Sequence, residues 1–232
     1  MTCNAPEDAT LILSLREMRL IFERLVHVER PLPGMVQSLR DCAVYSALLG
    51  AGGIAGLERN LAALAWPASS RLAAEESGPS GVRVDAAGLH AWLVAEAALD
   101  LAAAQLRREA GASVRLAVTN VAAPEELAVI AGFAEAQGLV ASPTAEGFDI
   151  APAPQGRETL FGRLRRDGFP CAAALWWPLY RKSALALAPD SYESRRHAGT
   201  IIVAETGEVI GRTDEDETDL SLLTAAPEKV LQ

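Results

Sequence analysis

Cysteine is scarce in this chain of 232 residues. Only Cys3, Cys42 and Cys171 are present, and no two of them form a C-x-x-C pair. The sequence therefore offers no support for a zinc site or a thioredoxin-like motif. A sparse and odd set of cysteines also favours a reducing compartment over a secreted, disulfide-bonded domain.

Long hydrophobic runs are missing as well. No apolar stretch reaches the roughly 18 residues that a membrane-spanning helix needs. The first ten residues, MTCNAPEDAT, are polar and acidic, and they lack the basic start and apolar stretch of a signal peptide. We therefore expect a cytoplasmic protein that has no membrane partner.

Basic residues are outnumbered by acidic ones. The chain has 21 Lys and Arg against 30 Asp and Glu, which gives a net charge of −9. Such a charge repels nucleic-acid phosphates at long range, so we expect no nucleic-acid partner. The charge is uneven, because residues 157–197 hold eight basic and four acidic residues, whereas 205–232 hold two basic and eight acidic ones. The basic segment is either a solvated face or a surface that binds an anion or the acidic tail.

The residues that are present indicate a folded protein. Half of them are hydrophobic and 22% are charged, as is typical of a soluble globular chain. Ser14-Leu15-Arg16-Glu17 fits a capping box, and apolar residues at helical spacing extend this helix over 14–30. Further helices are expected over 35–49, 53–65, 86–109, 124–137 and 157–167 and after 169, and strands over 82–84, 113–121, 139–142, 148–151 and 184–188, with a hairpin over 200–211.

These elements predict an α/β or α+β fold, in which a helical N-terminal part precedes a small mixed sheet with covering helices. We divide the chain into a helical N-terminal part (1–66), a linker or loop (67–81), an α/β part (82–211) and an acidic tail (212–232).

A glycine-rich segment follows the second predicted helix. Gly50, Gly52 and Ala55 match the G-x-G-x-x-A pattern of a dinucleotide-binding turn. The segment before it has helical rather than strand periodicity, which favours a helix–helix turn in which small residues permit close packing. The nucleotide interpretation is the weaker of the two.

The densest polar cluster lies near the C-terminus. Ser194, Arg195, Arg196 and His197 combine a hydroxyl, two guanidinium groups and an imidazole. Guanidinium forks suit carboxylate or phosphate oxygens, and an imidazole can carry a proton near neutral pH. We therefore predict that Ser194, Arg195 and Arg196 bind a ligand and that His197 is a catalytic proton carrier. An exposed loop is the alternative.

Two carboxylates in the acidic segment that follows complete the predicted catalytic set. Asp214 and Asp216 lie within Thr213–Asp219, whose sequence is TDEDETD. The segment fails the Ca²⁺-loop pattern, so we assign no metal site and leave the cofactor unknown. Cys171 is either a nucleophile served by His197 or, more simply, a small apolar core residue.

Short motifs at the two ends of the chain carry a resemblance. They are Ser14-Leu15-Arg16-Glu17 at the start, and Pro189 to Arg195, Gly199 and Thr213-Asp214-Glu215-Asp216 near the end. Over about a quarter of the chain they resemble an uncharacterised bacterial family of similar length. A hairpin over 200–211 replaces the family's glycine-rich stretch, and Glu215 replaces an Asn. The family has no assigned function, so the resemblance implies no activity.

Two main hypotheses follow for function, and a nucleotide-binding regulator that depends on residues 50–55 is a third possibility. The first is an enzyme, or an enzyme subunit, that acts on a small anionic metabolite bound by Arg195 and Arg196. The second is a non-catalytic subunit that binds a protein partner or forms a homo-oligomer, with Trp176 and Trp177 as interface anchors. If these two tryptophans are buried in the core, the second hypothesis loses its main argument.

Overall fold

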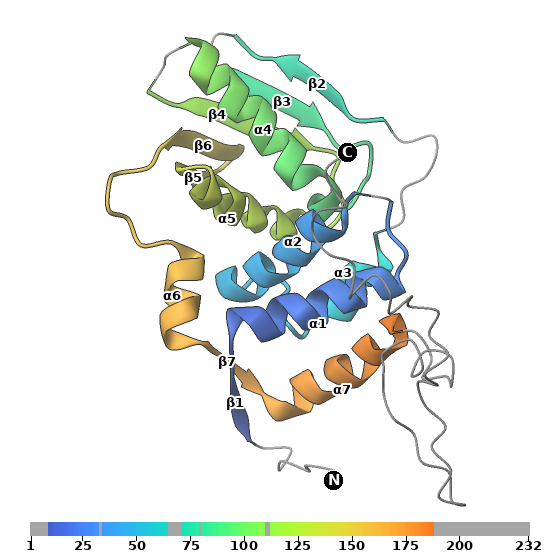
Figure 1. The fold of residues 1–232 in the computed structure, drawn as a ribbon. Helices are drawn as coiled ribbons and strands as arrows, with labels where there is room; N and C mark the ends of the chain where they lie inside the picture. Colours follow the sequence, from blue (N-terminus) through green and yellow to red (C-terminus); the bar gives the residue numbers. More distant parts are fainter. Residues whose placement is uncertain (1–8, 33, 65–70, 79, 110–111, 188–232) are drawn as a thin grey trace, which may run out of the picture. The chain divides into compact units, whose positions relative to one another are not determined.

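The computed structural model describes residues 9–187, except 33, 65–70, 79 and 110–111. The chain divides into two compact units, residues 1–186 and 187–232. The first unit contains both helices and strands, so the predicted mixed α and β structure is confirmed (Figure 1). The hairpin predicted over 200–211 lies outside the described residues.

The first unit begins with a short strand and three helices. β1 (Thr10–Leu13) leads into α1 (Leu15–Val28), which is followed by α2 (Val36–Leu49) and α3 (Leu57–Ala62). The predicted capping box is present: the Ser14 hydroxyl accepts a hydrogen bond from the Glu17 amide at 3.2 Å, and the Glu17 carboxylate accepts one from the Ser14 amide at 2.8 Å. Two groups that a helix end leaves unpaired are thereby satisfied.

The turn between α2 and α3 contains the glycine-rich segment. Gly50 has φ 68° and ends α2 in the left-handed conformation that glycine adopts without strain. The helix–helix interpretation of this segment is confirmed. The nucleotide interpretation is wrong, because the element before Gly50 is a helix and not a strand. α3 is shorter than the predicted helix over 53–65, since the turn continues to Gly56.

The middle of the sequence of this unit forms a five-stranded sheet. Its strands are β2 (Ala73–Glu76), β3 (Gly81–Asp85), β4 (Val114–Thr119), β5 (Leu139–Thr144) and β6 (Gly147–Pro152), in the order β2-β3-β4-β6-β5. β3 and β4 are parallel and are connected by α4 (Ala91–Glu109), whereas the other pairs are antiparallel. β2 lies within the polar stretch 67–81, where we expected a linker or loop.

One face of the sheet packs against helices. Val82 and Leu116 are buried, whereas the neighbouring Arg83 and Arg115 are exposed, as the alternation along a half-buried strand requires. α4 and α5 (Val129–Ala136) contact both the sheet and each other. The predicted helix over 124–137 begins as a short 3-10 turn, η1 (Pro124–Ala128).

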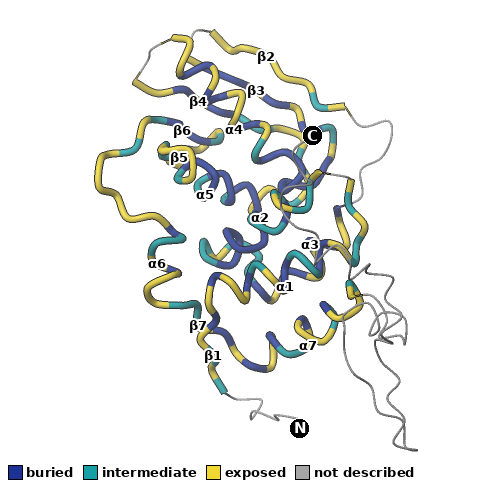
Figure 2. The backbone as a smooth tube through the Cα atoms, viewed as in Figure 1, coloured by how far each residue is buried: buried dark blue, intermediate teal, exposed yellow. Residues whose placement is uncertain are grey.

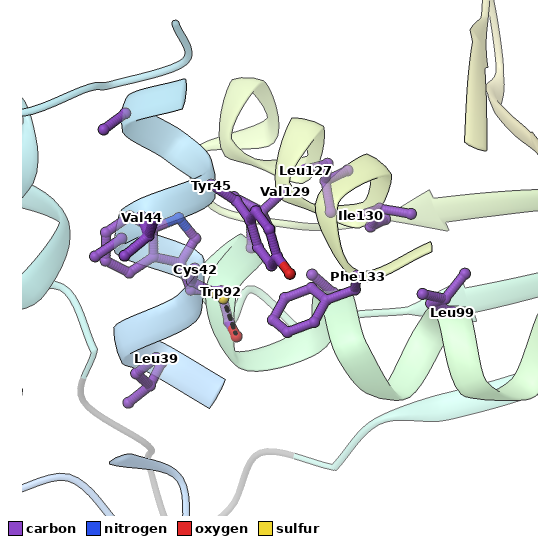
Figure 3. Packing of buried hydrophobic residues seen from close by; sticks show 14 of the residues in the cluster. Leu39, Cys42, Val44, Tyr45, Trp92, Leu99, Leu127, Val129, Ile130 and Phe133 are labelled. Atoms are coloured by element: carbon purple, nitrogen blue, oxygen red, sulfur yellow. Dashed lines mark hydrogen bonds between the residues drawn. The ribbon is translucent and has the colours of Figure 1, made fainter. Parts of the chain in front are cut away.

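Aromatic side chains join the helices to this layer. The ring of Tyr45 on α2 lies edge-on to Phe133 on α5, with centroids 5.2 Å apart (Figure 3). It also stacks on Phe161 at 4.7 Å. The buried residues of the helices and of the sheet form one continuous core (Figure 2).

The unit ends with α6 (Leu160–Asp167), β7 (Phe169–Ala172), α7 (Ala173–Ser183) and η2 (Ala184–Ala186). β7 pairs antiparallel with β1, so the two ends of the unit meet. The helix expected after residue 169 is present as α7. The strand predicted over 184–188 is wrong, because residues 184–186 continue the helical path as a 3-10 turn.

The two tryptophans of α7 differ in burial. Trp176 is only 4% exposed and its ring packs edge-on to Phe22, with centroids 6.2 Å apart. Trp177 is partly buried and its ring lies edge-on to Tyr180. Trp176 is thus a core residue, which removes it from the surface that the partner-subunit hypothesis requires.

Candidate functional site

The predicted site residues lie outside the described part of the chain. They are Ser194, Arg195, Arg196, His197, Asp214 and Asp216. Their assignment stays a prediction. Cys171, in contrast, is described: it lies on β7, is 5% exposed, and burial raises the pKa of its thiol. These properties fit the core interpretation, since a nucleophilic cysteine needs a stabilised thiolate.

A cavity of about 610 Å³ opens where β1 and the start of α1 meet the end of α6. We call it the arginine-lined cleft. Its charged lining residues are Arg16, Arg19, Arg165, Arg166 and Asp167, and its apolar ones are Ile12, Leu13, Leu15 and Leu164; Ser14 and Gly168 complete it.

The charge of this cleft is opposite to that of the chain. Four arginines and one aspartate line it, although the whole chain has a net charge of −9. A concave surface that gathers one sign of charge concentrates ligands of the other sign. The cleft is therefore a candidate place for an anion to bind.

Two of the four guanidinium groups already have partners. Arg19 pairs with the Asp41 carboxylate through two hydrogen bonds of 3.2 Å, and it lies 4.7 Å above the centre of the Phe161 ring. Arg166 forms ion pairs with Asp167 at 2.8 Å and with Glu158. The hydrogen bond from Arg166 also lowers the pKa of the Asp167 carboxyl below its usual range.

The other two guanidinium groups are available. Arg16 and Arg165 form no ion pair with any residue in the described part of the chain. A guanidinium stays charged at every physiological pH, and its planar fork matches the oxygens of a carboxylate or a phosphate. These two arginines are therefore the groups that can bind an incoming anion.

The local backbone sets the shape of the cleft. Gly168 ends α6 with φ 71°, and a side chain at this position would collide with Ile12 across the cleft wall. Glycine is thus needed at Gly168 for two reasons, a left-handed conformation and close approach of β1. The capping box at Ser14 fixes the other wall, and its hydrogen bonds lower the pKa of Glu17.

The lining residues determine what chemistry the cleft can perform. Among them there is no histidine, cysteine or lysine. Arginine can bind and polarise a substrate, but it does not exchange protons at neutral pH. The one carboxylate in the lining, Asp167, is held by Arg166. The groups of the cleft that lack a described partner are thus suited to binding an anion.

A second polar cluster lies in the interior, just beyond the carboxyl ends of β3 and β4. Glu126 is fully buried, and its two carboxylate oxygens accept hydrogen bonds from Asn60 Nδ2 at 2.5 Å and Trp92 Nε1 at 2.9 Å. Gly52 presses against the same carboxylate, so that a side chain there would collide with it. We call Asn60, Trp92, Glu126 and the adjacent His90 the buried polar cluster.

His90 is held in one neutral form. Its Nδ1 accepts a hydrogen bond from the Trp92 amide at 3.2 Å, which places the proton of the neutral ring on Nε2. Burial lowers the pKa of His90, and Nε2 has no hydrogen-bond partner in the described chain. The cluster joins α3, α4 and η1, and since its carboxylate is fully buried we interpret it as a structural brace.

Neither the cleft nor the buried polar cluster could be predicted from local sequence patterns. The basic excess over 157–197 pointed toward Arg165 and Arg166, but nothing local connects them with Arg16, which lies about 150 residues earlier. Glu126 follows Pro124 at a predicted helix start, where acidic residues are usually exposed. Its partner Asn60 is 66 positions away, so only the fold reveals the contact.

Neither a metal centre nor a membrane span is found within the described ranges. No three histidine, cysteine, aspartate or glutamate residues there come close enough to hold a metal ion. None of the described helices is both long and apolar enough to cross a bilayer.

Comparison with known proteins found six chains among the solved structures, and three of them are given below. No family model and no curated protein matches this chain. Malate dehydrogenase from Pyrococcus horikoshii OT3 is 11% identical over 76% of this chain and 65% of that one, with a TM-score of 0.46. Malate dehydrogenase from Entamoeba histolytica is 9% identical over 57% of this chain and 38% of that one, with a TM-score of 0.40.

The third structure is delta1-piperideine-2-carboxylate reductase from Pseudomonas syringae pvar. tomato. It is 20% identical over 76% of this chain and 70% of that one, with a TM-score of 0.42. The chain spans less than two thirds of the length of either malate dehydrogenase. All three TM-scores are below 0.5. The bacterial family suggested by the chain ends stays a hypothesis.

Proposed function

We propose that this protein binds a small anionic metabolite in the arginine-lined cleft, as an enzyme or as a subunit of one. The observation that carries the proposal is the pair Arg16 and Arg165. Both line the cleft, and neither forms an ion pair with any described residue. An unpaired guanidinium beside a cavity is a ready donor to a carboxylate or phosphate.

The four arginines have different roles in this proposal. Arg16 and Arg165 contact the anion directly. Arg19 is a positioning residue, because Asp41 and Phe161 fix its guanidinium and its charge adds to the field in the cleft. Arg166 is largely neutralised by its two carboxylate partners. The two guanidinium groups without described partners can therefore share the oxygens of one carboxylate or phosphate.

The test is isothermal titration of the full chain with inorganic phosphate and with short carboxylates. Arg16→Gln and Arg165→Gln each remove one charge-assisted hydrogen-bond donor, and each should weaken binding by about tenfold or more. Arg163→Gln is the matched control, because Arg163 is an exposed arginine of α6 that does not line the cleft. Equal effects of the three changes would contradict the proposal.

The segment with Ser194, Arg195 and Arg196 is the alternative anion site, and His197 with Asp214 or Asp216 is the proposed source of proton transfer. Arg195→Ala separates the two locations. If the alternative holds, Arg195→Ala abolishes binding and Arg165→Gln leaves it unchanged. If the cleft is the site, the pattern is reversed.

A further inference from the structure

We infer that the ligand of the arginine-lined cleft is amphiphilic, an aliphatic chain that ends in a carboxylate or a phosphate. The inference rests on the proposed function and names the class of ligand. Its starting point is that the cleft is lined by two kinds of residue, guanidinium groups and aliphatic side chains.

The aliphatic lining comes from β1, α1 and α6. Leu13, Leu15 and Leu164 belong to the core and are only 3%, 7% and 2% exposed, so the apolar surface open to a ligand comes mainly from Ile12. Ile12 is 64% exposed and lies against Gly168 at the rim. Contact between water and the exposed side chain of Ile12 is unfavourable, so an aliphatic chain that covers this side chain would gain free energy from the burial of apolar surface.

The polar side chains of the lining are four guanidinium groups, one carboxylate and one hydroxyl. Arg16 and Arg165 are the guanidinium groups without described partners, and Asp167 is already bound by Arg166. The cleft therefore offers strong donors for an anionic head and few groups for other polar substituents. A highly hydroxylated or zwitterionic metabolite would leave its remaining polar groups unpaired beside leucine, which is unfavourable.

Nucleotides are disfavoured by the same lining. Bases bind proteins largely by stacking on aromatic rings or by hydrogen bonds to their edges. No aromatic, Asn or Gln side chain is among the residues that line the cleft. Phe161 lies beneath Arg19, and its face is occupied by that guanidinium.

The test compares head groups with and without an aliphatic chain. Acetate, butyrate, hexanoate and octanoate, and inorganic phosphate and octyl phosphate, are titrated into the full chain below their micelle concentrations. Each methylene that enters the cleft should tighten binding by up to about fourfold. Comparison of octanoate with octyl phosphate shows which head group is preferred.

Three variants distinguish binding of the anionic head group from binding of the ligand's aliphatic chain. Ile12→Thr keeps a β-branched residue in the strand and should flatten the dependence on chain length, with a larger loss of affinity for octanoate than for acetate. Arg165→Gln should weaken every probe by a similar factor. Leu101→Ala is the control, since Leu101 is a 43% exposed leucine outside the cleft, and it should change neither.

The outcomes separate this inference from the proposed function. If octanoate binds no more tightly than acetate, while Arg165→Gln still weakens both, the amphiphilic ligand is wrong and the anion site survives. If no probe binds, or if Arg165→Gln has no effect, both fail. If affinity rises with chain length and Ile12→Thr removes the rise, the inference holds.

Discussion

Asn60→Asp is a sharp test of the buried polar cluster, because it changes one donor into an acceptor without changing the shape of the side chain. In the native protein Asn60 Nδ2 donates to Glu126 Oε1 at 2.5 Å, and both residues are 1% exposed or less. The change would place two carboxyl groups in contact inside the core. They cannot both be ionised there, so the folded protein must hold a proton between them.

The magnitude follows from the proton that the folded variant must hold. An ordinary carboxyl group titrates near pH 4, and one pH unit corresponds to about 1.4 kcal/mol. Holding a proton at pH 7 therefore costs about 4 kcal/mol of unfolding free energy. Only the folded state binds this proton, so the loss grows as pH rises and shrinks by about 1.4 kcal/mol per unit as pH falls toward 5.

The assay is urea unfolding of wild type and variant at several pH values, followed by circular dichroism. Asn120→Asp is the matched control. Asn120 also donates to a carboxylate, Asp85 at 3.1 Å, but this pair is exposed, so its change should cost less than about 1 kcal/mol. A loss for Asn60→Asp that is small, or that does not vary with pH, would refute our interpretation of the brace.

Two further predictions concern the core. Burial lowers the pKa of His90, so at acidic pH the unfolded chain takes up a proton that the native state does not. The free energy of unfolding should therefore fall as pH drops below about 6.5. His90→Gln should make this fall smaller in the same unfolding assay, whereas His27→Gln, a change at an exposed histidine, should not. Trp176→Ala should lower the free energy of unfolding by about 3–5 kcal/mol, because it empties a packed position beside Phe22. Leu175→Ala, a change at a 44% exposed neighbour, should lower it by less than about 1 kcal/mol. Similar losses for the two variants would contradict the assignment of Trp176 to the core.

Local signals account for the elements that were predicted correctly. The capping box at Ser14 and the apolar spacing of α1 involve residues a few positions apart, and so do the alternation of β4 and the left-handed Gly50. In each case the physical cause, a cap, a face or a positive φ, is visible within one or two turns of chain.

The elements that were missed depend on distant partners. β1 and β7 are strands because they pair with each other, with Leu11 opposite Cys171, 160 positions away. Neither segment has an alternation of apolar and polar residues strong enough to predict a strand. β2 has the sequence AAEE and is fully exposed, so only its pairing with β3 makes it a strand. Both candidate locations share this property, since each joins residues far apart in the sequence.

The contrast between the cleft and the rest of the chain bears on the kind of ligand that fits. At physiological salt, charges separated by more than about 8 Å are largely screened. An anion inside the cleft lies within that distance of Arg16 and Arg165 but is screened from most of the chain's net charge of −9. Binding of a small anion in the cleft therefore depends on these two guanidinium groups and not on the net charge of the whole chain.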